Sequence, residues 1–162
     1  MTGEGILNKL QGVKYLYLSQ LSEPRDNSVR IVVEEANLNA RGSAEPPSPE
    51  LKFLLEGARP IEPTAGCRTF ELYWREYAAY CVTEELVGSN ARTGYEDESY
   101  CGGVLRLYTK SHFLDHILRN TGGHLKAVQH WKLICLNHLI DVAAYGAPEI
   151  TLVNIRDGRM PQ

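Results

Sequence analysis

The sequence predicts an α+β fold: a mostly antiparallel β-sheet of six or more strands, with one clear helix at about 112–120 packed on it. Several short runs alternate apolar and polar residues, which is the period of a strand with one buried face. The links between these runs are of hairpin length, too short for the crossovers that parallel strands need. Only one segment repeats its apolar residues with the helical period.

The first half of the chain begins with a predicted hairpin. Residues 13–21 and 29–33 alternate with period 2, with Val13, Tyr15, Tyr17 and Leu21 on one side of the first strand, and residues 22–28 supply turn-forming proline, aspartate and asparagine. Residues 37–50 lose this period and are rich in proline, which predicts a polar loop. The apolar stretch 51–55 indicates no particular element.

The middle of the chain predicts strands around a second loop. Residues 68–85 are rich in aromatic and β-branched residues, which favours one long bent strand or a pair of strands. Residues 88–100 are polar and form a predicted loop. Another strand is expected over 104–109.

The predicted helix has clear ends. Ser111 is a good N-cap, and Gly122-Gly123 supplies the stop. On a helical wheel the apolar side chains Phe113, Leu114, Ile117 and Leu118 share one face, and His112, Asp115, His116 and Arg119 share the other. After the helix, strands are expected from residue 128, over 139–144 and over 150–155.

Length and composition limit the function. A chain of 162 residues with 43% hydrophobic residues is of a size for one domain, 1–162. A net charge of −3 without a cluster of Lys and Arg argues against a nucleic-acid partner. The N-terminus has no secretory signal pattern and no apolar window of membrane-spanning length occurs, which favours a cytoplasmic protein without a membrane partner. The four cysteines are widely spaced, which is typical of buried or half-buried thiols rather than of zinc or disulfide motifs.

Motifs of common enzymes are absent. The sequence contains neither of the two glycine-rich phosphate-binding patterns GxxxxGK[ST] and GxGxxG. The metalloprotease pattern HExxH, the hydrolase pattern GxSxG and the deaminase signature are also missing. Since many hydrolases carry no short motif, this absence weighs less than a presence would.

Histidines concentrate in one part of the chain. All five lie between residues 112 and 138: His112, His116, His124, His130 and His138. Because residues i and i+4 of a helix lie on one side, His112 and His116 form a candidate divalent-metal site, with Asp115, His124 or His138 as third ligand. Both histidines, however, face away from the apolar side of the predicted helix, toward solvent. We therefore favour the interpretation that His112 and His116 are ordinary solvent-facing side chains rather than metal ligands.

Two further constellations deserve weighing. Cys135, His138 and Asp141 have the residue types of a nucleophile, a base and an orienting acid. Cys135 alternates in phase with apolar neighbours, so a buried and inert thiol is favoured. Asp141 lies on an otherwise apolar strand. It is expected at a water-facing sheet edge, and a buried carboxylate there would need a partner such as His138.

Acidic residues and tyrosines favour a binding surface in the second loop. Glu84-Glu85 and the run Glu96-Asp97-Glu98 place five carboxylates around residues 88–100. Their spacing matches no calcium-binding loop, so surface acidity is the favoured interpretation. Tyr95 and Tyr100 bracket the second acidic run, and tyrosine is enriched at protein interfaces. The predicted partner-binding residues are therefore Tyr95, Glu96, Asp97, Glu98 and Tyr100, which suit a basic protein partner.

Three stretches of the second half resemble a family of small bacterial proteins: Phe70–Val82, Leu107–Asp115 and Asn137–Val142. That family has no assigned activity, and its members look similar to the immunity partners of bacterial toxins. The resemblance implies a bacterial source and a protein-neutralising role. It carries over no catalytic residue.

These observations lead to one predicted function and one alternative. We predict a non-enzymatic protein-binding module of the immunity type, with no catalytic residues and no cofactor. The alternative is a metal-assisted hydrolase that uses the histidine cluster at His112 and His116. A homo-oligomer stays open, and a small-molecule pocket between sheet and helix would leave no sequence signature.

Overall fold

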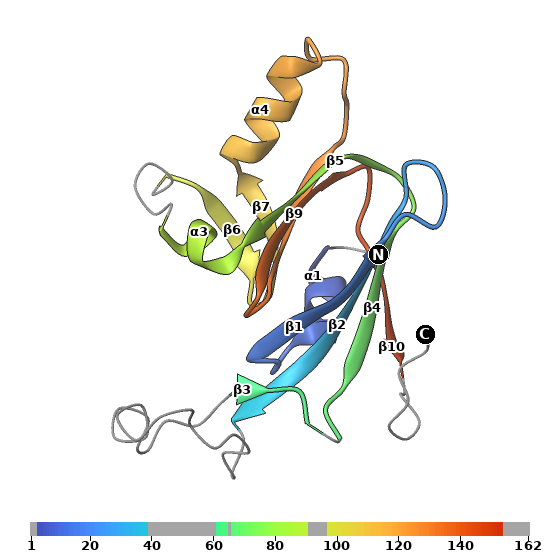
Figure 1. The fold of residues 1–162 in the computed structure, drawn as a ribbon. Coiled ribbons are helices and arrows are strands. Elements are labelled where there is room, and N and C mark those ends of the chain that lie inside the picture. Colours follow the sequence, from blue (N-terminus) through green and yellow to red (C-terminus); the bar gives the residue numbers. More distant parts are fainter. Residues whose placement is uncertain (1–2, 39–60, 65, 91–96, 154–162) are drawn as a thin grey trace.

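A computed structural model describes residues 3–38, 61–64, 66–90 and 97–153 of the chain (Figure 1). Within this part the protein has two five-stranded sheets, in which every strand pairs antiparallel to its neighbours. The predicted mostly antiparallel α+β class is confirmed.

The first sheet has the order β1-β2-β4-β10, with the short β3 on the far part of β2. Its strands are β1 (Tyr15–Ser22), β2 (Val29–Leu38), β3 (Ile61–Glu62), β4 (Thr69–Trp74) and β10 (Glu149–Val153). The predicted hairpin of β1 and β2 is confirmed, with a register shift between Leu18 and Gln20. The pairing of β4 with β10 joins segments that are far apart in the sequence.

The second sheet has the order β5-β9-β8-β7-β6. Its strands are β5 (Tyr77–Glu84), β6 (Ser99–Gly102), β7 (Leu105–Lys110), β8 (Gln129–Ile134) and β9 (His138–Ala144). The chain passes from the first sheet to the second between β4 and β5. The segment 68–85 is therefore a pair of strands, and each belongs to a different sheet.

Helices are short and lie at the ends of strands. They are α1 (Gly3–Leu7), a 3₁₀ turn η1 (Asn8–Leu10), α3 (Glu85–Asn90) and α4 (His112–Asn120). The predicted helix 112–120 is confirmed as α4, including its N-cap Ser111, whose hydroxyl oxygen accepts a hydrogen bond from the Leu114 N–H. Gly122 and Gly123 follow it with φ of 62° and 75°, a backbone region that glycine adopts without strain.

The hydrophobic core lies between the two sheets. Leu16, Ile31 and Leu72 reach it from the first sheet, and Trp131, Ile140 and Val142 from the second. Alternation places the next residues on the opposite face of the second sheet. His130 and Asp141 are on that outer face, together with α4, whose own residues are all only partly buried or exposed.

One side chain joins the edge of the first sheet to the second. The Asn137 side chain lies in the turn before β9 and bonds both backbone groups of Leu18 in β1. Its Oδ1 accepts the Leu18 N–H at 2.9 Å, and its Nδ2 donates to the Leu18 carbonyl at 3.0 Å. The Leu136 N–H also donates to the Leu16 carbonyl at 2.8 Å. The outer edge of β1 is therefore occupied at Leu16 and Leu18.

Several predicted details are wrong. Residues 88–90 and 99–100 are helical and extended respectively, rather than loop, and residues 37–38 still belong to β2. The prediction that Tyr15, Tyr17 and Leu21 share one side of β1 is wrong for Leu21. The register shift after Leu18 puts Leu21 on the face of Leu16 and Leu18, which contacts the core. Most of the loop 37–50, all of 51–55 and residues 154–155 lie outside the described residues.

Candidate functional site

A buried chain of hydrogen bonds starts at the N-terminus of α4. The Ser111 hydroxyl oxygen lies 2.6 Å from Nδ1 of His130, and it also accepts the bond from the Leu114 N–H at 3.0 Å. Since that oxygen accepts from the helix, its own proton is available to the imidazole. Ser111 is only 4% exposed and His130 only 1%.

The expectation that Asp141 faces water at a sheet edge is wrong: it is buried on β9, an inner strand of the second sheet, where it completes the chain of hydrogen bonds. His130 Nε2 lies 2.9 Å from the Asp141 carboxylate. Nδ1 accepts from Ser111, so the network assigns the proton of a neutral ring to Nε2, which donates to Asp141. Lys132 lies directly opposite Asp141 in the pairing of β8 and β9, and its ammonium group is 3.1 Å from the same carboxylate oxygen. The buried carboxylate is thus paired with a cation, as burial requires.

Aromatic rings enclose the imidazole. Tyr108 is the cross-strand neighbour of His130 and stacks on it, with ring centroids 4.3 Å apart and an interplanar angle of 25°. The ring of Phe113 in α4 is also close, with its centroid 5.1 Å from that of the imidazole and an interplanar angle of 49°. Burial raises the pKa of the Tyr108 phenol. The polar chain therefore lies in an apolar setting, in which its hydrogen bonds matter more than they would in water.

Serine, histidine and aspartate in this order are the residue types of a hydrolytic triad. A nucleophilic serine must let a substrate carbon approach its oxygen to about 3–3.5 Å. The Ser111 oxygen is instead buried, and its bonds to the α4 backbone and His130 already use it. The arrangement is therefore a structural contact that fixes the start of α4 on the outer face of the second sheet.

The acidic residues of the predicted binding loop are bonded within the chain. The Asp97 carboxylate lies 2.5 Å from the Lys110 ammonium group and 2.6 Å from Nε2 of His112. The Glu98 carboxylate accepts the His112 N–H at 2.8 Å, near the positive end of the α4 dipole. Tyr100 is exposed, and the Arg106 guanidinium lies 4.3 Å above its ring. Tyr95 and Glu96 lie outside the described residues.

The contacts of Asp97 lead to a titration prediction. The Lys110 hydrogen bond, followed by the one from His112, lowers the pKa of Asp97 to about 2. Because this folded-state pKa is depressed, the stabilising effect is present above the ordinary carboxyl pKa and is lost as the pH falls toward about 2. NMR titration of the carboxyl should show this depressed pKa in the native chain and a return toward the ordinary value in Lys110→Met. An unchanged pKa in that variant would contradict the contact.

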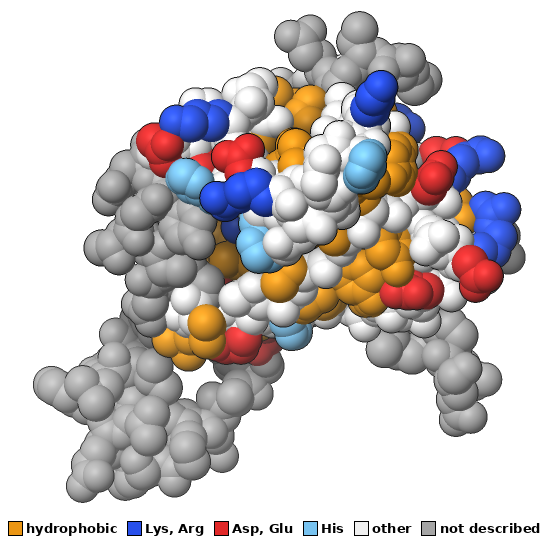
Figure 2. Space-filling view, turned by 90° about the horizontal axis from the view of Figure 1, so that it is seen from above, with side chains coloured by type: hydrophobic (Ala, Val, Ile, Leu, Met, Phe, Trp, Pro, Cys, Tyr) orange, Lys and Arg blue, Asp and Glu red, His pale blue; other side chains and the backbone are white. Residues whose placement is uncertain are grey.

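The two histidines of the metal hypothesis point to separate partners. His112 contacts Asp97, and His116 Nε2 lies 2.8 Å from the amide nitrogen of Asn120. Figure 2 shows histidine side chains spread over the face that carries α4, among acidic and basic side chains. No group of three or more His, Cys, Asp or Glu side chains suited to hold a metal ion occurs among the described residues. An open hollow of about 620 Å³ beside α4 is lined by His112, Asp115, Leu118, Arg119, Gly122 and Gly123.

Cys135, His138 and Asp141 do not converge as a triad. The Asp141 carboxylate bonds His130 and Lys132, and burial raises the pKa of the Cys135 thiol to about 12. The expectation that all four thiols are buried or half-buried is wrong for Cys81 and Cys101, which are exposed.

These exposures predict the order of thiol labelling. Ellman's reagent should modify Cys81 and Cys101 in the native protein, because both are exposed. Cys135 should react only after denaturation, since its thiol is buried and protonated at neutral pH. Mass spectrometry of the labelled peptides would identify the sites. Rapid native labelling of Cys135 would contradict its placement.

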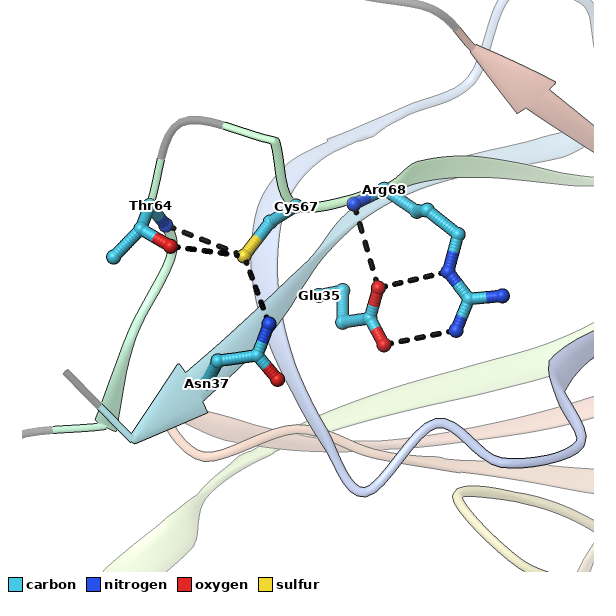
Figure 3. A network of polar contacts seen from close by, with 5 residues as sticks. All are labelled: Glu35, Asn37, Thr64, Cys67 and Arg68. Atoms are coloured by element: carbon cyan, nitrogen blue, oxygen red, sulfur yellow. Dashed lines mark hydrogen bonds and ion pairs between the residues drawn. The ribbon is translucent and has the colours of Figure 1, made fainter. Parts of the chain in front are cut away.

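A second polar network lies at the far end of the first sheet (Figure 3). Arg68 binds both carboxylate oxygens of Glu35 at 2.8 Å, and these hydrogen bonds lower the pKa of Glu35. The Cys67 sulfur accepts hydrogen bonds at 3.4 Å from the Asn37 amide and the Thr64 N–H, and the Thr64 hydroxyl lies at the same distance. These contacts tie the end of β2 to the segment that enters β4.

Three exposed apolar side chains lie close together in the sequence, at the end of β5 and in α3. Val82 is 41% exposed, Leu86 65% and Val87 64%. Glu84 and Glu85 lie between them in the sequence, and a Glu84 carboxylate oxygen accepts the Val87 N–H at 3.3 Å. These five residues are called the β5–α3 surface below.

Sequence reasoning named Ser111 only as a helix cap and missed His130 as the partner of Asp141. A signal was present: His130 alternates with the core residues Trp131 and Leu133, which turns it toward the outer face where the predicted helix packs. The β5–α3 surface was not predicted because leucine and valine are residue types that are usually buried, so the sequence gives no reason to expect Leu86 and Val87 at the surface.

Comparisons with known proteins gave no relative: no family model, no curated protein and no solved structure matches the chain. No helix in the described part of the chain is long and apolar enough to cross a membrane.

Proposed function

We propose that the chain is a non-enzymatic protein-binding module that captures a basic protein partner through the β5–α3 surface. Neutralisation of a bacterial toxin is the particular role that the resemblance to immunity proteins implies. A basic protein partner is also the class that the sequence predicts. The proposed contact residues are those of the Val82–Val87 segment, in place of the 95–100 segment predicted from the sequence.

The observation that carries the proposal is the exposure of three large apolar side chains within six consecutive residues. Isolated exposed apolar residues are common, but several large ones exposed within a short segment favour an interaction site. Covering Val82, Leu86 and Val87 removes apolar area from water, which contributes roughly 1 kcal/mol for each half-exposed side chain. A partner gains the full contribution only if it covers all three side chains.

The charge of the surface selects the partner. Residues 77–90 contain Glu84 and Glu85 and no Lys or Arg. Among the described residues no ion pair engages either glutamate, whereas Asp97 is paired with Lys110 and His112. Complementary charge speeds encounter and disfavours partners of like charge. Lys and Arg on the partner are therefore expected to meet these two carboxylates.

The test uses matched surface variants. Val82→Thr and Val87→Ser remove apolar area, and Val82→Thr keeps the branched shape that suits a strand. Leu152→Thr is the control, because Leu152 is 51% exposed on β10 of the other sheet. Proteins captured from a lysate of the source organism by the native chain are identified, produced separately and titrated against all variants.

The proposal expects a basic protein that binds the native chain and Leu152→Thr equally. Binding to the double variant Val82→Thr/Val87→Ser should be at least tenfold weaker, which corresponds to about 1.4 kcal/mol. Equal binding by the native and double-variant chains would remove this surface from the function. Turnover of the captured protein, instead of stable binding, would overturn the non-enzymatic role.

A further inference from the structure

We infer that the partner binds as an added β-strand along the open edge of β5, through an extended, mostly apolar segment that carries a Lys or Arg near the end that meets Glu84. This inference rests on the proposed function and adds its geometry. A strand added to a sheet edge gains main-chain hydrogen bonds, and the alternating side chains supply specificity.

β5 is the longest available strand edge in the described part of the chain. It has eight residues and lies at the end of the second sheet, where β9 is its one strand partner among the described residues. A strand paired on one side presents a row of N–H and C=O groups on the other. The unpaired side of β5 continues directly into α3, which carries Leu86 and Val87.

The other sheet edges are shorter or occupied. Asn137 and Leu136 bond the backbone of β1. The Lys9 ammonium group donates to the Ile150 carbonyl of β10 at 2.9 Å. β6 has only four residues. β5 is therefore the edge on which an added strand has the most room.

Apart from a register shift at its start, between Tyr77 and Ala79, β5 lacks the devices that usually protect an edge. Natural edges carry Lys, Pro or inward-pointing charges, which oppose pairing with another chain. Residues 77–83 read Tyr-Ala-Ala-Tyr-Cys-Val-Thr and contain none of these. The first charge along the strand is Glu84 at its end. An unguarded edge of this length is a liability unless a partner uses it.

The start of β5 is held rigidly, so little order has to be gained on binding. The Tyr77 N–H donates to the Asn27 carbonyl at 2.8 Å. The hydroxyl groups of Tyr77 and Tyr80 both donate to the Glu23 carboxylate, at 2.9 and 2.7 Å. The bonds to this carboxylate raise the pKa of both phenols, that of Tyr80 to about 12, so both donors stay protonated at neutral pH. A pre-ordered edge lowers the entropic cost of association.

The two faces of β5 set the side-chain pattern of the added strand. Cys81 lies opposite Asp141, so Ala79, Cys81 and Thr83 share the outer face. These side chains are small and leave room for large apolar residues of the partner. Val82 and Glu84 point to the other face, where an apolar residue followed by a Lys or Arg would match them. A second copy of this chain would instead bring the same carboxylates, so a different and basic chain is the better occupant.

The experiment uses a synthetic peptide. A random linear twelve-residue library displayed on phage is selected on the native chain, and the strongest binder is synthesised with blocked ends. Two N-methylated forms are made, which block alternate backbone N–H groups in opposite phase. An added strand predicts that one form binds at least tenfold more weakly and that the other binds like the parent. Hydrogen exchange should show protection of alternate β5 amides by the parent peptide.

The outcomes separate this inference from the proposed function. If both methylated forms bind like the parent but the double variant Val82→Thr/Val87→Ser does not, the surface stands and strand addition is overturned. If the double variant also binds the parent peptide as tightly as the native chain does, both the proposed binding surface and strand addition are overturned. If sedimentation shows a dimer of the chain alone with protected β5 amides, a second copy occupies the edge and the inference is overturned. Selection of acidic peptides would overturn the assigned charge.

Discussion

Replacing His130 by alanine is expected to lower the free energy of unfolding by about 3–5 kcal/mol. The substitution removes the bridge between Ser111 and Asp141, and it leaves the buried carboxylate with Lys132 alone. It also leaves a cavity next to the rings of Tyr108 and Phe113. Urea denaturation, followed by the fluorescence of the two tryptophans, would measure the loss.

Two control variants test whether the loss of stability is specific to the buried hydrogen bonds of His130. His116→Ala changes an exposed imidazole on α4, so the free energy of unfolding should stay within about 0.5 kcal/mol of the native value. Ser111→Ala removes the helix cap and one bond to His130, and should cost about 1–2 kcal/mol. If His130→Ala cost no more than His116→Ala, the buried chain of hydrogen bonds would not exist in solution.

Replacing Trp131 by alanine is the second change with a large expected effect, about 3–5 kcal/mol of unfolding free energy. The ring is 0% exposed and lies in the core between the sheets, where partial collapse cannot refill its volume. Differential scanning calorimetry together with urea denaturation would quantify the loss. A loss below about 1 kcal/mol would contradict the position of the ring.

The variant Trp131→Phe distinguishes the effect of ring volume on stability from the effect of the indole N–H. The Nε1 atom of Trp131 is buried and has no hydrogen-bond partner among the described residues. A buried donor without a partner costs about 1–3 kcal/mol, so its removal offsets part of the volume lost with the smaller ring. The phenylalanine variant should therefore lose clearly less stability than the alanine variant. Equal losses would indicate that the indole N–H is satisfied in solution.

Local signals in the sequence predicted the elements that local interactions determine. The helix α4 followed from the cap at Ser111, the stop at Gly122-Gly123 and the apolar period between them. The hairpin of β1 and β2 followed from two alternating runs around a turn. The division of residues 68–85 into two sheets was beyond this reasoning, because it depends on the distant strands β9 and β10.

The partner of Asp141 shows why the site was only partly predictable. His138 is three residues away on the same strand, and residues three apart in a strand lie on opposite faces. His130 reaches Asp141 across the pairing of β8 and β9, with Lys132 directly opposite the carboxylate. That register is a tertiary property, so a single sequence offers His130 as a candidate but cannot select it.

The Lys9 ammonium group contacts the Ile150 carbonyl 141 residues further along the chain, and β10 pairs with β4. During synthesis, the first sheet therefore stays incomplete until residues 149–153 have left the ribosome. Such non-local topology is typical of proteins that fold in milliseconds to seconds. In that interval the edge of β4 is open to other nascent chains, and residues 149–153 act as the closing segment that ends this exposure.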